Sequence, residues 1–213
     1  MAEKLSRGTS FSYRCNGCGR CCHDKTIQVN PYEIARLSRN RKLGTREFIE
    51  RHLSEDGPYL KSKYNGACEF LGSGGCEVYE DRPLVCRLYP LGREVTPDGK
   101  EFFFEVPPHP LTRGEYGTKG AVRDFLDKQE TKLFVEAADR YHAMVNDLLL
   151  EISEGSVEGK KAPVMDWLDL DTMLAQSDED IAGLSLEQRV ALHVASIKES
   201  ADTLKKEGEE HGE

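Results

Sequence analysis

The stretch Cys15-Asn16-Gly17-Cys18-Gly19-Arg20-Cys21-Cys22 decides how the chain can fold, because it holds four of the seven cysteines. The other three follow in one short region, and no cysteine occurs later in the chain: they are Cys68, Cys76 and Cys86. Each C-x-x-C step returns the second sulfur to the side of the first, and small glycines let backbone amides turn toward thiolates. This spacing is typical of metal ligands.

A disulfide framework and scattered buried thiols are the alternative interpretations of these cysteines. An odd number of cysteines leaves one unpaired, and residues 1–10 lack the apolar core and cleavage site of a secretory segment. Core thiols would also not be confined to the first 86 of 213 residues. We therefore expect metal binding. The adjacent Cys21 and Cys22 suit two metals or a polynuclear centre better than one zinc ion, because neighbouring side chains diverge.

The cysteines also stand in a longer pattern. It consists of Cys15-x-x-Cys18-Gly19-x-Cys21-Cys22, then Cys68-Glu-Phe-Leu, then Gly75-Cys76-Glu-Val-Tyr79-Glu-Asp-Arg82-Pro83-x-x-Cys86-Arg87-Leu-Tyr89-Pro90. This pattern resembles the YkgJ-type family, or CxxCxxCC family, of zinc- or iron-chelating domains, from about Tyr13 to about Gly117. The resemblance implies a zinc or iron cofactor, with an iron–sulfur cluster as one form, and leaves the reaction undefined.

The resemblance also implies an eighth ligand. Family members often carry an eighth cysteine in a C-P-G-like segment after a short hairpin, and here the matching stretch is His109-Pro110-Leu-Thr-Arg113-Gly114. His109 is therefore a candidate eighth ligand, since imidazole can replace thiolate at zinc or at Rieske-type iron. His23, next to Cys22, is a candidate for contact with a ligand rather than with the metal.

Arg82 and Arg87 flank the last cysteine and have two interpretations. In the first they form salt bridges with Glu80, Asp81 or another acidic neighbour. In the second their guanidinium groups donate hydrogen bonds to thiolate or sulfide, or hold an anionic substrate. The sequence does not choose between these two uses.

The charge distribution and the apolar runs of the sequence limit the classes of function that we expect. The net charge of −9 is uneven: residues 1–93 hold 16 Lys or Arg and 11 Asp or Glu, against 13 and 27 in the remainder. A basic surrounding lowers thiol pKa values and favours metal capture. The basic residues are spread out, so we do not expect nucleic-acid binding. No apolar run approaches the roughly 20 residues that span a bilayer, and we expect a cytoplasmic protein without membrane contact.

The periodicities predict an α+β fold. We expect strands at residues 25–29 and 59–64, helices from Pro31 to about Ser38 and, capped by Thr45, from Arg46 to Leu53, and a β-hairpin over residues 91–106. A long amphipathic helix should run from about Gly120 to Ile152, and a capping box at Ser185 should open a last helix. Residues 154–161 read as a linker, and Asp166, Asp169 and Asp171 as a solvated face.

These elements suggest a metal-binding module at residues 13–117 and a helical extension at residues 118–206, with flexible ends at residues 1–12 and 207–213. No phosphate loop, dinucleotide fingerprint or hydrolase motif occurs, so the sequence names no catalytic residue. Three hypotheses remain. The chain is a metal-stapled protein, an iron–sulfur or metal-dependent enzyme or its accessory subunit, or a scaffold that delivers metal to a protein partner.

Overall fold

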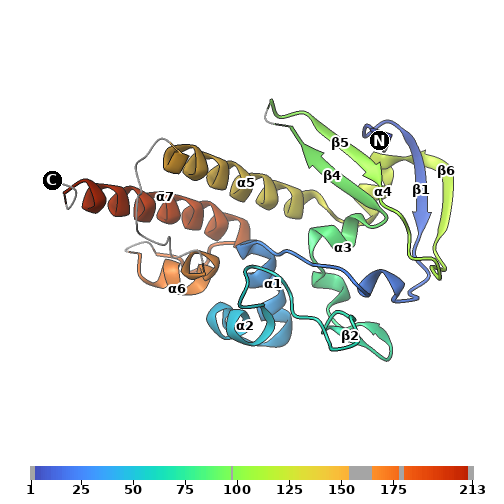
Figure 1. The fold of residues 1–213 in the computed structure, drawn as a ribbon, viewed down its shortest axis with the longest axis horizontal. Helices are drawn as coiled ribbons and strands as arrows, with labels where there is room; N and C mark the ends of the chain where they lie inside the picture. The colour runs from blue at the N-terminus through green and yellow to red at the C-terminus, as the bar shows by residue number, and fades with distance from the viewer. Residues whose placement is uncertain (1–2, 97, 154–164, 178–179, 211–213) are drawn as a thin grey trace. The chain divides into compact units, whose positions relative to one another are not determined.

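The computed structural model describes residues 3–96, 98–153, 165–177 and 180–210 (Figure 1). The predicted linker at residues 154–161 and the chain ends 1–2 and 211–213, which belong to the termini expected to be flexible, lie outside these ranges. The chain forms two compact units, each built from two separate parts of the sequence. Unit 1 contains residues 1–28 and 59–133, and unit 2 contains residues 29–58 and 134–213. All seven cysteines are in unit 1.

Unit 1 holds the strands of the structure in three antiparallel pairs (Figure 1). The pairs are β1 (Ser10–Arg14) with β6 (Glu115–Ala121), β2 (Leu71–Gly72) with β3 (Gly75–Cys76), and β4 (Leu91–Val95) with β5 (Glu101–Glu105). The β4–β5 pair confirms the predicted hairpin, and the Thr96 amide closes its turn on the Lys100 carbonyl at 2.9 Å. Pro97, predicted to begin this turn, lies outside the described residues.

The helical elements of unit 1 are short: η1 (Arg20–Cys22), η2 (Tyr79–Asp81), α3 (Leu84–Leu88) and α4 (Val122–Lys128). Its core gathers buried aromatic rings, with Phe103 fully enclosed and Phe11 meeting Phe125 edge to face at 5.2 Å. The strands predicted at residues 25–29 and 59–64 are wrong. Those segments contribute only isolated bridges, such as Gln28 to Tyr59, because too few consecutive backbone groups face each other.

Unit 2 is helical. It contains α1 (Pro31–Arg41), α2 (Thr45–His52), most of α5 (Lys132–Ser153), η3 (Asp166–Leu168), α6 (Leu170–Ala175) and α7 (Leu186–Glu210). Asn30 and Glu33 form the capping box at the start of α1, and Ser185 and Gln188 form the one that precedes α7. Helices and short strand pairs together confirm the α+β class. No described helix combines the length and the apolar character needed to cross a membrane.

The long helix predicted from Gly120 to Ile152 is wrong at its beginning. Gly120 still belongs to β6, and two helices follow, α4 and α5, with a break at residues 129–131. Glu130 adopts a left-handed backbone, with φ of 52°, and the buried Thr131 turns its hydroxyl to the Leu126 carbonyl at 3.2 Å. The hydrophobic period continues through this break, so the periodicity alone could not reveal it.

Two predictions about polar residues of unit 2 are also wrong. Gly44 rather than Thr45 is the N-cap of α2, and the Thr45 hydroxyl instead donates to the carboxylate of Asp169. Asp169 is fully buried, whereas Asp166 and Asp171 are exposed as expected of a solvated face. Its carboxylate also accepts from the Thr172 amide at 3.2 Å and lies 2.8 Å from Arg46 Nε. A buried carboxylate is tolerated here because it is paired and hydrogen-bonded.

Candidate metal centre

Three segments of unit 1 carry the cysteines. Residues 15–22 form a loop that ends in η1, the β2–β3 hairpin follows Cys68 and ends on Cys76, and α3 carries Cys86. The first two segments are joined directly, because the Cys68 amide donates to the Cys22 carbonyl at 2.7 Å. Gly19 has a left-handed backbone, with φ of 68°, and a Cβ there would lie 3.1 Å from Leu71. The loop and the hairpin therefore approach closely at Gly19, where the left-handed backbone favours glycine.

All seven thiols are free, and all except the exposed Cys15 are partly buried. The Sγ atoms of Cys21 and Cys22 lie 3.9 Å apart. Cys22 also interacts electrostatically with Cys86 and Cys76, and Cys76 interacts with Cys68. Cysteines that are up to 65 residues apart in sequence thus belong to one electrostatic cluster.

The thiols of this cluster differ in acidity. The hydrogen bond from Cys22 is the main cause that lowers the pKa of Cys21 to about 7, and the positive charges of Lys25 and Arg82 act in the same direction. The same bond, together with burial and the neighbouring thiols, raises the pKa of Cys22. Burial raises the pKa of Cys68 and of Cys76. A bound cation would offset the cost of burying negatively charged thiolates. The thiols would therefore release their protons when the metal binds.

Backbone amides point at several sulfurs. The Gly17 amide lies 3.4 Å from Cys15 Sγ, and the amides of Arg113 and Arg20 lower the pKa of Cys18 by donating to it. The amides of Phe70 and Val78, each two residues after a cysteine, likewise donate to Cys68 and Cys76 and act to lower the pKa of these thiols. Amide donors of this kind stabilise thiolates at metal sites and orient them.

The two arginines of the motif donate to backbone carbonyls and to the side chain of Gln129. The fully buried Arg87 donates to the carbonyls of Glu80, Arg82 at 3.0 Å and Gln129 at 2.9 Å. Arg82 donates to the Gln129 side chain at 2.8 Å and stacks over the Tyr79 ring at 3.9 Å. Arg82 also lowers the pKa of both Cys21 and Cys76.

The segment 109–114 folds back over the first cysteine loop. Asn16 donates to the Arg113 carbonyl at 2.7 Å, and the Thr112 hydroxyl contacts Cys18 and lowers its pKa. His109 itself accepts the Leu111 amide on Nδ1 at 3.0 Å, and its own amide binds the Tyr89 hydroxyl at 3.3 Å. The Nδ1 of His23 lies 3.2 Å from the Gly19 carbonyl. Both imidazoles thus have local backbone partners.

Two residues at this site were not singled out in the sequence. Thr112 touches Cys18, and Gln129 receives both motif arginines. Thr112 lies within the stretch that matches the family's eighth-ligand segment, so its position near the cysteines could have been predicted from the sequence. Gln129 gave none, because it stands in the middle of an apparently continuous helix.

The donor set fits a thiophilic metal, since zinc and iron–sulfur clusters are both held by Cys thiolates. In the part of the chain that the structure describes, no three His, Cys, Asp or Glu side chains converge closely enough to hold one ion. The chemistry of the ligands therefore agrees with metal binding, whereas the sulfur positions do not identify the metal or the number of ions.

Comparison with known proteins supports the same chemistry. Residues 14–109 match the model of the CxxCxxCC family, described as "Putative zinc- or iron-chelating domain", which confirms the resemblance seen in the cysteine pattern. A stretch of 118 residues is 28% identical to an uncharacterized protein of Methanocaldococcus jannaschii. The match covers 54% of this chain and 64% of that relative, so it spans less than two thirds of the relative's length. No solved structure matches the chain significantly.

Proposed function

Because residues 14–109 match the CxxCxxCC family, we propose that unit 1 binds zinc or iron through all seven of its cysteines. The proposed ligands are Cys15, Cys18, Cys21, Cys22, Cys68, Cys76 and Cys86. One observation carries this proposal: free thiols from three separate segments form a single electrostatic cluster. The amide donors and the charge of Arg82 favour the thiolate form at several of these sulfurs, and the thiolate is the form that binds a cation.

Arg82 and Arg87 would act on this site in different ways. Arg82 lowers the pKa of Cys21 and Cys76, so its charge would help to keep these ligands deprotonated. Arg87 follows Cys86 directly, and its guanidinium group donates to three carbonyls around α3. We propose that Arg82 tunes the thiolates and that Arg87 fixes the position of the helix that carries Cys86.

The metal would supply different chemistry according to its identity. Zinc in a closed thiolate site is redox-silent and contributes folding free energy on the order of 10 kcal/mol per ion. An iron–sulfur cluster would supply an electron-transfer centre. The first case favours a metal-stapled or metal-delivering protein, and the second favours a redox enzyme or its accessory subunit.

The deciding experiment is elemental analysis of protein purified without oxygen, together with its visible spectrum and acid-labile sulfide content. Colourless protein with one or two zinc ions would support the structural or metal-handling role. Brown protein with iron and sulfide would support the redox role. Protein that binds neither metal, even after anaerobic reconstitution with zinc or with iron and sulfide, would refute the proposal.

The Cys86→Ser variant tests the ligand set. We expect it to lose bound metal and to destabilise unit 1, because a hydroxyl is a poor replacement for thiolate at zinc or at an iron–sulfur centre. Val85→Ala is the matched control, since Val85 precedes Cys86 on α3 and its side chain is 46% exposed. Unchanged metal content in Cys86→Ser would remove Cys86 from the ligand set.

His109 is the candidate eighth ligand, and we propose that it binds the metal only if its ring gives up the hydrogen bond from the Leu111 amide. Its Nδ1 accepts the Leu111 amide, so coordination through Nδ1 would break that bond. Coordination through Nε2 would need a tautomer that places the proton on Nδ1, which also breaks it. His109→Ala should change the metal spectrum if His109 is a ligand, whereas an unchanged spectrum and stoichiometry would leave seven thiolates.

A further inference from the structure

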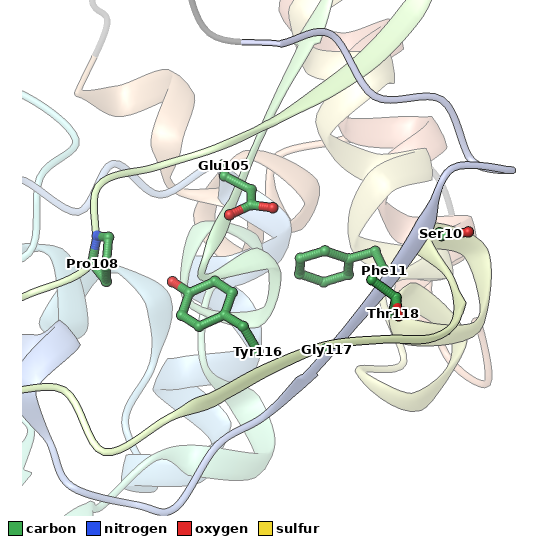
Figure 2. Close-up of a pocket in the computed structure, with 7 residues that line it drawn as sticks. All are labelled: Ser10, Phe11, Glu105, Pro108, Tyr116, Gly117 and Thr118. Carbon is green, nitrogen blue, oxygen red and sulfur yellow. The ribbon is translucent and has the colours of Figure 1, made fainter.

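The surface of unit 1 has a hollow that contains none of the cysteines. It lies between β1, β6, the end of β5 and the proline segment that follows β5 (Figure 2). Its lining consists of Ser10, Phe11, Glu105, Pro108, Tyr116, Gly117 and Thr118. Figure 2 shows the ring of Phe11 pointing across the hollow toward Tyr116, with the carboxylate of Glu105 over the gap between the two rings.

Among the described residues Glu105 has no cationic partner, in contrast to the other carboxylates of β5 and β6. Glu101, four residues earlier on β5, pairs with Arg7 and Arg93, both at 2.6 Å. Glu115, at the start of β6, pairs with Arg14 at 2.6 Å. Within the described ranges, no Lys or Arg forms an ion pair with Glu105. The hollow therefore carries an uncompensated negative charge beside aromatic rings.

The aromatic side of the hollow is held in place. Tyr116 is 41% exposed, and its ring packs edge to face on Tyr13 at 5.0 Å between centroids. Phe11 is buried and packs on Phe125, so it cannot turn away. Burial, the two phenols of Tyr89 and Tyr13, and the charge of Glu105 raise the pKa of Tyr116 to about 12. The surroundings thus disfavour an additional anion.

We propose that this hollow, whose floor includes the buried Phe11, binds an organic ammonium group, with Glu105 as the counter-ion and the exposed ring of Tyr116 as the aromatic wall. A carboxylate supplies the opposite charge, and ring faces attract an alkylammonium through their quadrupole while covering its methylene or methyl groups. The lining of the hollow includes none of the proposed metal ligands.

Choline provides a suitable probe, because 3,3-dimethylbutan-1-ol has the same shape without the charge. The backbone amides of Gly117 and Thr118 report on the hollow in ¹⁵N-labelled full-length protein at constant ionic strength. We expect saturable shifts with choline and binding about twofold to fivefold weaker with the neutral isostere, the range given by an exposed cation–π contact or ion pair. Equal affinities, or no saturable shift at these amides, would overturn the proposal.

Variants separate the two contributions. Glu105→Gln should weaken choline binding about twofold to fivefold and leave the isostere unaffected, whereas Glu94→Gln, an exposed carboxylate on β4, should change neither. Tyr116→Phe keeps the ring and should keep binding, whereas Tyr116→Leu should weaken choline binding about twofold to fivefold, and unchanged affinity in Tyr116→Leu would reject the aromatic wall. Unchanged choline affinity in Glu105→Gln would reject the counter-ion. Metal content measured on each variant keeps this result distinct from any failure at the cysteine site.

Discussion

His193 makes the stability of unit 2 dependent on pH. The side chain is fully buried, and its Nδ1 lies 3.0 Å from the Tyr141 hydroxyl, with the two rings edge to face at 5.9 Å. Its Nε2 has no hydrogen-bond partner among the described residues. Burial lowers the pKa of His193 to about 4, although the charge of Asp169 opposes this shift. The folded unit therefore holds a neutral imidazole.

The sign of the effect follows from proton binding. Between pH 6.5 and about 4 the unfolded chain binds a proton at His193 that the folded chain does not. The stabilisation is complete above pH 6.5 and is lost as the pH falls toward 4. A pKa difference of this size corresponds to a loss of about 2 kcal/mol of unfolding free energy between pH 7.5 and pH 5.

Tryptophan fluorescence can measure this loss, because the only tryptophan, Trp167, lies in η3 of the same unit. Urea unfolding would be compared at the two pH values for wild type and His193→Gln, whose amide cannot titrate. The wild type should lose about 2 kcal/mol more than this variant over the interval. His142→Gln is the control, since His142 is exposed on α5 and should behave like wild type.

The carboxylate of Asp169 is held by Thr45 and Arg46, and neither His193→Gln nor His142→Gln alters these partners. An equal pH dependence in wild type and His193→Gln would refute the reasoning. It would mean that the buried imidazole is protonated at little cost in the folded state, or that the unit opens around it.

Three further predictions concern stability. Arg87→Met should lower the unfolding free energy of unit 1 by about 3 kcal/mol or more, because three carbonyls lose a buried charged donor. Hydrogen exchange at the amides of α3 and α4 measures this loss, and a value below about 1 kcal/mol would contradict the prediction. Asn30→Ala should cost about 1 kcal/mol in urea unfolding followed by Trp167 fluorescence, because it removes the cap of α1, whereas Asn30→Asp should cost much less. Gly66→Ala should cost about 1 kcal/mol or more in thermal unfolding, because φ is 76° and the new Cβ would lie 2.3 Å from Asp24 Oδ1. Gly74→Ala, in the same unit and with open space around the new Cβ, is its control, and equal melting temperatures of the two variants would contradict the strain.

Local chemistry in the sequence determined much of the fold and of the candidate site. The cysteine spacing indicated the resemblance to the CxxCxxCC family, and the hairpin of β4 and β5, the helix that begins at Pro31 and the capping box at Ser185 were correctly predicted. These features depend on residues within a few positions of one another. Their geometry is therefore set before distant parts of the chain meet.

Distant partners decided the rest. Arg87 binds Gln129, which lies 42 residues later, and the break between α4 and α5 occurs where this carbonyl is taken up, although the hydrophobic period runs on without interruption. Thr45 and Asp169 read locally as a helix cap and a solvated acid, yet they meet across 124 residues in a buried pair. Burial and pairing are properties of the folded chain, because a side chain's environment depends on segments that only the tertiary structure brings together.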